Sequence, residues 1–286
     1  TCNSAGNNAF FVKKDLLNDK VKENNLEKGF VINKFRESRT KEGNLAYLSK
    51  IEEQKIIFSL PLTEVWLKIL ITGVFGFIGQ SLYQSLKHKY DVKGIGRDKK
   101  ISKIKKNNNL LDNNITNQNL IKLNFQPDVI LHCAGSGSVS KSYEDKKIDY
   151  DKNVRTSKEV LKFIEYLKKK PRVIIFSSAA VYGNNCNKNR KKLIPISPYG
   201  KNKLTSEKIF KIKSKKEKFD LMILRFYSIY GKGLKKQLIW DVCEKINNSM
   251  NVFFGSGNEI RSWINIIDVN RLIQFLIKKG SIKNQI

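Results

Sequence analysis

A short apolar run that ends in a glycine-rich turn constrains the fold of this chain more than any other feature. Residues 66–72 (WLKILIT) lead directly into residues 73–79 (GVFGFIG). Ile78, Leu82 and Leu86 then follow at four-residue spacing, as on one face of a helix. The pattern predicts a buried strand, a tight turn and a helix in succession. Glycines in such a turn let the backbone approach a pyrophosphate, which the free N–H groups at the helix start can bind.

The same alternation of strand and helix continues along the chain. Apolar runs that predict strands occupy residues 90–96, 127–135, 172–183 and 219–231, and a helical stretch occupies residues 153–167. Strands that alternate with helices in this way predict a parallel sheet with helices on both faces. We therefore expect an α/β fold built on a Rossmann-like, doubly wound parallel sheet.

The chain is strongly basic, with 55 Lys and Arg against 26 Asp and Glu and a formal net charge of +29. Such a balance attracts polyanions. The lysines are scattered among Asn and Ile, however, as in residues 105–114, 188–192 and 211–218, and they do not alternate with aromatic residues as a nucleic-acid groove would require. We interpret these stretches as solvated loops and helix faces, and we expect no specific nucleic-acid partner.

Cysteine and histidine usage gives no sign of a metal site. Cys2, Cys133, Cys186 and Cys243 are widely spaced, and the chain has only two His. This spacing predicts neither a zinc site nor a disulfide framework, and it fits a cytoplasmic location. No apolar run approaches the roughly 18 residues that a membrane span needs.

Two further motifs carry chemistry. Tyr199 and Lys203 form a YxxxK, and residues four apart lie on one face of a helix. A free tyrosine has a pKa of roughly 10, and a nearby ammonium group would lower that pKa and allow proton transfer. Ser178 lies at the end of a predicted strand, where open α/β sheets bind ligands. Each motif alone also fits a structural role, as a turn, a helix face or a cap.

The glycine turn, the strand-end Ser178 and the YxxxK occur in this order along the chain, and together they indicate a family. From about Leu67 to its end the chain resembles the extended short-chain dehydrogenase family, which includes nucleotide-sugar epimerases, dehydratases and reductases. Four further segments agree with the resemblance: HCAG (132–135), DYDKNV (149–154), LRFYSIYG (224–231) and GSGNEIRSWINIIDV (255–269).

The resemblance implies a division of the chain. Residues 1–66 would be an N-terminal extension of unknown role, and residues 67–286 an NAD(P)-binding Rossmann-like domain. Substrate-binding elements would lie mainly in residues 183–198 and 232–286. Family members usually continue beyond the helix predicted over residues 268–277, so we expect a smaller, truncated C-terminal substrate-binding part.

The resemblance also implies the site residues. Ser178, Tyr199 and Lys203 would be the catalytic triad. The cofactor would be bound by these last two together with Gly73, Gly76, Phe77, Ile78, Gly79, Arg97, Asn114, Ala134, Gly135 and Asn153. The substrate would be bound by Tyr182, Ser228 and Arg261, with the guanidinium of Arg261 on the diphosphate. No metal is expected.

Departures from the family pattern narrow the reaction and the cofactor. Dehydratases and decarboxylases of the family carry acidic residues where this chain has Ala179 and Ala180, and alanine cannot transfer a proton. NAD-preferring members carry an acidic residue at the end of the second strand, where this chain has Arg97. The arginine favours NADP, and Asp98 beside it leaves NAD open. Asn114 stands in place of a frequent Asp, and Ser228 in place of a frequent Asn.

The resulting expectation is an NAD(P)-dependent nucleotide-sugar epimerase or 4-keto reductase that moves hydride at the sugar C4. Tyr199 would transfer the proton, with Lys203 stabilising the phenolate and Ser178 orienting the oxygen. The rival class is a non-catalytic sensor or scaffold on the same fold, which would not need these three side chains together. The partner would be a nucleotide-diphosphate sugar, and the family also implies a homodimer.

Overall fold

The computed structural model describes residues 66–97, 108–185, 192–234, 236–250 and 262–278. The chain divides into two units, Thr1–Val65 and Trp66–Ile286, and every described residue belongs to the second. The predicted N-terminal extension therefore falls almost wholly outside the described residues. Among the helices that the structure describes, none is long and apolar enough to cross a membrane.

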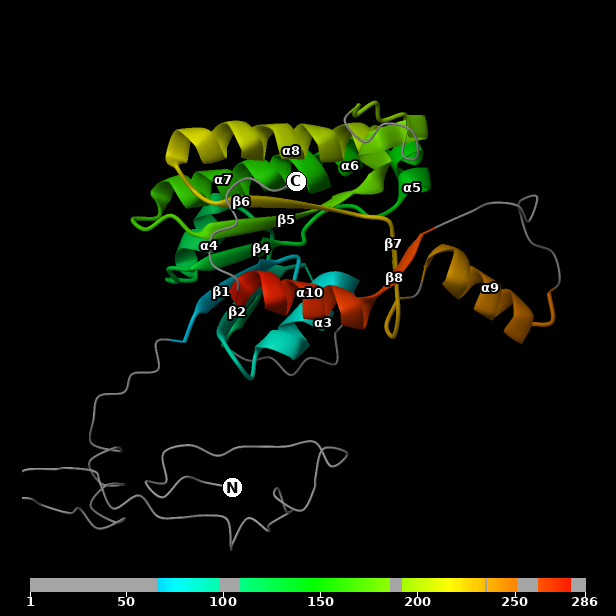
Figure 1. Ribbon diagram of the computed structural model, residues 1–286, viewed down its shortest axis with the longest axis horizontal. Helices are drawn as coiled ribbons and strands as arrows, with labels where there is room; N and C mark the ends of the chain where they lie inside the picture. The colour runs from blue at the N-terminus through cyan, green and yellow to red at the C-terminus, as the bar shows by residue number, and fades with distance from the viewer. Residues whose placement is uncertain (1–65, 98–107, 186–191, 235, 251–261, 279–286) are drawn as a thin grey trace, which may run out of the picture. The chain divides into compact units, whose positions relative to one another are not determined.

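A six-stranded parallel sheet forms the centre of the second unit (Figure 1). Its strands are β1 (Lys68–Thr72), β2 (Asp91–Gly96), β3 (Leu110–Asp112), β4 (Val129–His132), β5 (Arg172–Ser178) and β6 (Leu221–Phe226). Their order across the sheet is β3-β2-β1-β4-β5-β6, and every neighbouring pair is parallel. The chain winds outward from β1 to β3 and then in the other direction from β4 to β6. The predicted Rossmann-like doubly wound fold is confirmed.

Helices cover both faces of the sheet (Figure 1). One face carries α3 (Phe77–Leu86) and α10 (Ile266–Lys278), and the other carries α4 (Asn117–Lys122), α7 (Thr156–Tyr166) and α8 (Pro198–Glu217). The alternation within β1 shows why its centre is apolar at three successive positions: Ile69 and Ile71 pack in the core with α3 and α10, and Leu70 packs in the core with α7 and α8. Successive strand residues point to opposite faces, so the centre of a strand buried on both faces is apolar without alternation.

Shorter elements connect these layers. They are α5 (Val139–Glu144), α6 (Lys146–Tyr150), the π-helical turn η2 (Asp151–Arg155), the 3-10 segment η3 (Ala179–Asn185) and α9 (Gln237–Asn247). A second, two-stranded parallel sheet pairs β7 (Ser228–Tyr230) with β8 (Trp263–Asn265).

The long helix α8 has clear end signals in the sequence. The side chain of Ser197 accepts a hydrogen bond from the backbone N–H of Gly200 at 3.0 Å, and Pro198 occupies the first turn. The helix ends at Lys218, whose φ of 54° places it in the left-handed region. The N-cap at Ser197 places Tyr199 and Lys203 in the first two turns of α8.

Three stretches differ from the sequence prediction. Residues 172–183, predicted as one strand, form β5 only as far as Ser178 and continue as the 3-10 segment η3. Residues 219–231, predicted as one strand, form β6 and β7, because the chain leaves the large sheet at Tyr227 and pairs next with β8. Residues 105–114, predicted as a solvated loop, include β3. Leu110 and Leu111 pack against the two different cores, so this short segment gains burial by joining the sheet.

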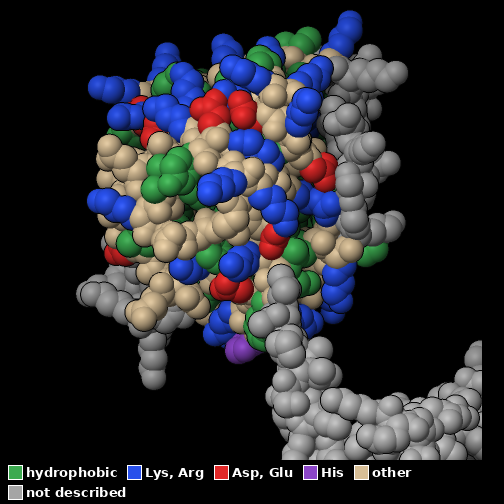
Figure 2. Space-filling model, turned by 90° about the vertical axis from the view of Figure 1, so that its left-hand side faces the viewer, with side chains coloured by type: hydrophobic (Ala, Val, Ile, Leu, Met, Phe, Trp, Pro, Cys, Tyr) green, Lys and Arg blue, Asp and Glu red, His purple; other side chains and the backbone are tan. Residues whose placement is uncertain are grey.

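Basic side chains are dispersed over the face of the molecule drawn in Figure 2, with acidic and uncharged groups between them. They do not gather into a single stripe there. On this face, the distribution agrees with the interpretation of the lysine-rich stretches as solvated surface.

Candidate active site

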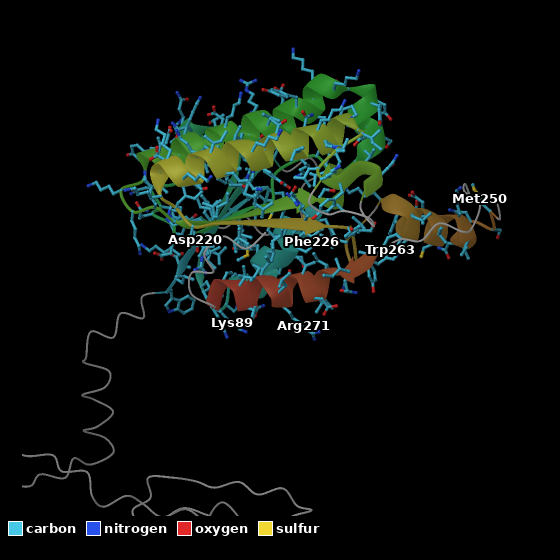
Figure 3. All side chains as sticks on the ribbon, turned by 45° about the horizontal axis from the view of Figure 1, so that its top comes forward. Lys89, Asp220, Phe226, Met250, Trp263 and Arg271 are labelled. Carbon is cyan, nitrogen blue, oxygen red and sulfur yellow. The ribbon has the colours of Figure 1, made fainter. Side chains whose placement is uncertain are left out.

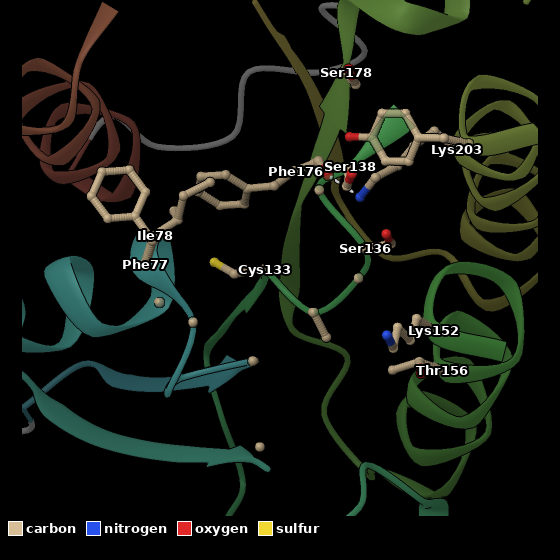
Figure 4. Close-up of a pocket in the computed structure, with 18 of the residues that line it drawn as sticks. Phe77, Ile78, Cys133, Ser136, Ser138, Lys152, Thr156, Phe176, Ser178 and Lys203 are labelled. Carbon is tan, nitrogen blue, oxygen red and sulfur yellow. Dashed lines mark hydrogen bonds between the residues drawn. The ribbon is translucent and has the colours of Figure 1, made fainter. Parts of the chain in front are cut away.

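A cleft of about 2320 Å³ follows the carboxyl ends of the strands, where the strand order reverses between β1 and β4. Ligands of open α/β sheets bind at such a switch point. In Figure 4, Phe77 and Ile78 of α3 lie on one side of this cleft, and Ser178 and Lys203 lie on the other. The chain therefore brings its glycine turn and its catalytic candidates to one hollow.

The glycine turn has a shape that only glycine permits. Gly73 has a φ of +77°, and a Cβ there would lie 2.7 Å from the Cα of Ala134. A Cβ on Gly79 would collide with the carbonyl oxygen of Gly73. The backbone N–H of Gly73 donates to the carbonyl of Ile95 at 2.7 Å, which joins the turn to β2. The first turn of α3 carries no acidic side chain that would repel an anion, and its free N–H groups can donate hydrogen bonds to one.

The other predicted cofactor residues divide into two sets. Arg97, Asn114, Ala134 and Gly135 line the cleft together with the glycine turn. Asn153 does not line the cleft but supports its wall. Its Oδ1 accepts a hydrogen bond from the Ser136 backbone N–H at 3.2 Å and would lie 2.7 Å from a Cβ on Gly135.

A π-helical turn holds Asn153 in this place. Within η2 the helix is widened, and the Asn153 carbonyl accepts hydrogen bonds from the hydroxyls of Ser157 at 2.6 Å and Ser206 at 3.0 Å. The Asn153 side-chain amide donates to the Asp149 carbonyl at 3.0 Å. Because Ser206 belongs to α8, these bonds tie the wall of the cleft to the helix that carries Tyr199.

Ser178, Tyr199 and Lys203 come together at the carboxyl end of β5. The Tyr199 hydroxyl lies near Ser178, whose side chain acts to lower its pKa. The Lys203 ammonium lies 5.9 Å from the centre of the Tyr199 ring and donates to the Phe176 carbonyl at 3.0 Å. Tyr199 and Lys203 are both buried. The structure thus assembles the residues that the sequence proposed for proton transfer.

Burial dominates the electrostatics of this group. Desolvation lowers the pKa of Lys203 to about 8, while Cys133, Asp149 and Glu207 oppose the fall. Burial raises the pKa of Tyr199, Asp149 adds to the rise, and the hydrogen bond from Ser178 opposes it. The expectation that Lys203 leaves Tyr199 with a lowered pKa is therefore wrong for this arrangement.

The residues predicted to bind substrate lie in different places relative to the cleft. Ser228, at the start of β7, lines the cleft, as do Ala179 and Ala180. Tyr182 is buried outside the cleft lining, where its hydroxyl accepts a hydrogen bond from Arg225 Nη1 at 3.2 Å. Arg261 lies outside the described residues.

Three charged residues near the site were missed by the sequence analysis. Asp149 is buried. Its Oδ2 accepts a hydrogen bond from Asn202 at 2.8 Å, and its Oδ1 has no hydrogen-bond partner among the described residues. Glu207 and Arg225 form a buried ion pair of 2.7 Å. The position of Glu207 four residues after Lys203, on the same helix face, is a signal that could have revealed it.

The residues next to the site on β4 have a structural explanation. His132 bonds Thr72 Oγ1 through Nδ1 at 2.7 Å and Ser157 Oγ through Nε2 at 3.2 Å. Burial lowers the pKa of His132 to about 3, so the ring is neutral. Among the residues that the structure describes, no cluster of His, Cys, Asp or Glu could hold a metal ion.

Comparison with known proteins gives consistent matches. The model of the NAD dependent epimerase/dehydratase family matches residues 69–286. An uncharacterized UDP-glucose epimerase of Bacillus subtilis is 28% identical over 233 residues, which cover 74% of this chain and 73% of that protein. The crystal structure of UDP-glucuronic acid 4-epimerase from Bacillus cereus, in complex with UDP-glucuronic acid and NAD, is 25% identical with a TM-score of 0.67 and covers 74% of each chain. UDP-glucose 4-epimerase from Thermotoga maritima, with UDP-glucose, is 25% identical with a TM-score of 0.64, over 76% of this chain and 75% of that one.

Proposed function

This chain belongs to the NAD dependent epimerase/dehydratase family, and from that premise we propose that it is a nucleotide-sugar 4-epimerase. One observation carries the proposal. Ser178, Tyr199 and Lys203 meet at the edge of the cleft, and the glycine turn lines the same cleft. Family members that were matched are named as epimerases of UDP-glucose or UDP-glucuronic acid.

The glycine turn has the space and the donors that a dinucleotide needs. Gly73 and Gly79 leave room that a Cβ would fill, and the start of α3 offers N–H groups to a pyrophosphate. We propose that Phe77 and Ile78 form the adjoining wall and that Asn114 lies at the adenosine end. The chemistry that a bound dinucleotide supplies here is reversible exchange of a hydride with a sugar carbon.

The chain's own residues would handle the proton at the sugar C4 oxygen. Tyr199 would accept the hydroxyl proton and later return it, and Ser178 would orient the phenol and the sugar oxygen. Lys203 is charged below about pH 8 and lies 5.9 Å from the centre of the Tyr199 ring. Burial of Tyr199 opposes its ionisation, and the neighbouring Ser178 favours it.

Ala179 and Ala180 favour epimerisation over dehydration. Both line the cleft directly after Ser178, and neither can remove a proton from a carbon next to C4. A dehydratase needs an acid or a base at that place.

The test is to incubate the purified chain with NAD and UDP-glucose, and in parallel with UDP-glucuronic acid, and to separate the products by chromatography. We expect the 4-epimer of one of these sugars, with unchanged mass. A product that has lost water would instead identify a dehydratase. The variant Tyr199→Phe, as the control, should form no product.

Arg97 favours a second candidate, an NADPH-dependent 4-keto reductase. Arg97 is exposed in the cleft directly after β2, where it could pair with a 2′-phosphate. Titration with NADPH and NADH separates the candidates. Binding of NADPH at least about tenfold tighter than NADH, abolished in Arg97→Ala, would support the reductase. Binding of NADH that is as tight as that of NADPH, or tighter, would exclude the NADPH-dependent reductase and favour the epimerase.

A further inference from the structure

A fully buried carboxylate lies on the same helix as the catalytic candidates. Glu207 follows Lys203 by four residues and Tyr199 by eight on α8, so the three share one helix face. Its carboxylate accepts hydrogen bonds from Arg225 Nε at 2.9 Å, Arg225 Nη2 at 2.7 Å and the Ser177 hydroxyl at 2.5 Å. Three donors thus converge on one side chain that has no contact with solvent.

The partner guanidinium extends the contact to other elements. Arg225, on β6, also donates through Nη1 to the Tyr182 hydroxyl at 3.2 Å, and its Cζ lies 5.1 Å from the centre of the Tyr182 ring. Ser177 immediately precedes Ser178, and Tyr182 follows it in η3. The pair therefore joins β5, β6, η3 and α8 around the strand end that bears Ser178.

Stability alone is a poor explanation for this pair. The side-chain exposures of Arg225 and Glu207 are 8% and 0%, so both groups have lost their hydration. Apolar residues of similar volume in such a position are often neutral or stabilising. What a guanidinium fork and a carboxylate provide, and apolar side chains do not, is a fixed distance and a fixed orientation.

We propose that the Glu207–Arg225 pair is a positioning element for the proton-transfer group. It fixes the position of α8 relative to the end of β5, and so fixes Tyr199 and Lys203 relative to Ser178. The inference rests on the proposed function, because it assigns these residues to proton transfer. A misplacement of about 1 Å in such a group can slow turnover by up to about 100-fold.

The same two strands offer a matched control pair. Arg172, at the start of β5, donates through Nε to Asp220, just before β6, at 2.8 Å. Arg172 also bonds the Leu276 carbonyl at 3.0 Å. The side chains are 15% and 26% exposed, and they lie at the amino ends of the strands, away from the cleft. Asp220→Asn removes this ion pair without touching the site.

The first experiment replaces the buried pair by apolar residues. The double variant Glu207→Met with Arg225→Met should melt at or near the wild-type temperature. Its turnover of UDP-glucose or UDP-glucuronic acid should fall about 10- to 100-fold, with KM within about twofold of wild type. Asp220→Asn should keep wild-type turnover. A folded double variant with wild-type turnover would overturn the inference.

A conservative variant separates geometry from charge. Arg225→Lys keeps the positive charge but cannot form the two parallel bonds to Glu207. We expect its turnover to lie between wild type and the double variant. Wild-type turnover in Arg225→Lys would show that the reaction does not depend on the two parallel bonds from the Arg225 guanidinium to Glu207. This result would count against the proposal even if the double variant did not fold.

The pKa of Lys203 can be measured without any enzymatic turnover, so it tests this inference independently of the proposed function. The groups that face Lys203 are Cys133 and His132 from β4 and its end, Asp149 from α6, and Tyr199 and Glu207 from α8. Glu207 raises the pKa of Lys203, so Glu207→Gln should lower it.

The pKa of Lys203 can be followed as the pH dependence of its acetylation by acetic anhydride, read by peptide mass spectrometry. We expect the midpoint to move to lower pH in Glu207→Gln and to stay in place in Asp220→Asn. An unmoved midpoint in a folded Glu207→Gln would contradict the coupling. If the midpoint moves while the wild type converts no sugar nucleotide, the proposed function fails and the coupling of Glu207 to Lys203 stands.

Discussion

The two ends of β5 and β6 carry the same kind of ion pair in different surroundings. At the amino ends, Arg172 and Asp220 are 2.8 Å apart and partly exposed; at the carboxyl ends, Arg225 and Glu207 are 2.7 Å apart and almost completely buried. Figure 3 labels Asp220 and Phe226 at the opposite ends of β6. An exposed pair contributes about 0–1 kcal/mol. A buried one is expensive to desolvate and is expected where geometry matters.

The comparison extends to the whole sheet. In a parallel sheet all carboxyl ends meet at one edge, so groups from several strands can reach one ligand there. At that edge Lys203 is buried with a lowered pKa, and within the part of the chain that the structure describes Asp149 Oδ1 has no hydrogen-bond partner. At the other edge, Asp128 pairs with the exposed Lys169 at 2.8 Å. The carboxyl edge carries the energetically unfavourable groups, as a functional site does.

The largest effect should come from the carboxyl edge. Tyr199→Phe removes the phenolic proton but keeps the ring, so turnover should fall by about two to four orders of magnitude with dinucleotide binding retained. Tyr166→Phe, on the exposed side of α7, is the matched control and should leave turnover unchanged. Steady-state kinetics and an NADH fluorescence titration measure both quantities. Near-normal turnover in Tyr199→Phe would remove Tyr199 from the mechanism.

The buried charge of Lys203 should appear in the pH dependence of stability. Burial lowers its pKa from 10.5 to about 8. Between these values the unfolded chain still binds the proton that the folded chain has lost, so raising the pH favours folding. The gain is on the order of 3 kcal/mol, present in full only above pH 10.5.

Urea unfolding of wild type and Lys203→Met at about pH 8 and about pH 10 measures this contribution. The variant should lack the gain, while groups common to both chains cancel in the difference. Equal changes with pH in the two proteins would mean that Lys203 titrates normally.

A substitution in the glycine turn should have a smaller effect than one in the proton-transfer group, and it should act on stability and on NADH affinity. A Cβ at Gly79 would collide with the Gly73 carbonyl and lie 2.8 Å from the Val74 Cα, so Gly79→Ala should destabilise the fold by about 1–3 kcal/mol. It should also weaken NADH binding by about tenfold or more, because the turn must open. Gln84→Ala, on the exposed side of the same helix, is the control. Unchanged NADH affinity in Gly79→Ala would contradict the pyrophosphate site.

The smallest effect should come from the amino edge. Asp220→Asn breaks a partly exposed ion pair and should lower the free energy of unfolding by about 1 kcal/mol or less. Turnover should not change. A loss of turnover comparable to that of the Glu207 and Arg225 variants would erase the contrast between the two edges.

Residues 66–79 show how much of the fold was predictable. Their apolar run and glycine spacing predicted β1, the turn and α3, and the alternation of later segments predicted the parallel sheet. Strand β3 escaped prediction because its burial comes from tertiary packing of two leucines in a polar stretch. The break between β6 and β7 depends on pairing with β8, which lies far along the chain.

The site was predictable in its parts but not in its energetics. Spacing brought Tyr199 and Lys203 to one helix face, and the order of motifs joined them to Ser178. The raised pKa of Tyr199 depends on burial, which spacing does not reveal. The pair of Glu207 and Arg225 joins a helix to a strand, so only the folded chain shows it.

The most direct test of the account follows the hydrogen at the sugar C4. UDP-glucose and UDP-glucuronic acid, each carrying deuterium at C4, are incubated separately with NAD and the purified chain, and the products are examined by mass spectrometry and NMR. The account predicts the 4-epimer of one of these sugars with the deuterium retained, formed at least about 100-fold more slowly by Tyr199→Phe. A folded, NAD-binding chain that forms the epimer with loss of the deuterium to solvent would contradict hydride transfer at C4.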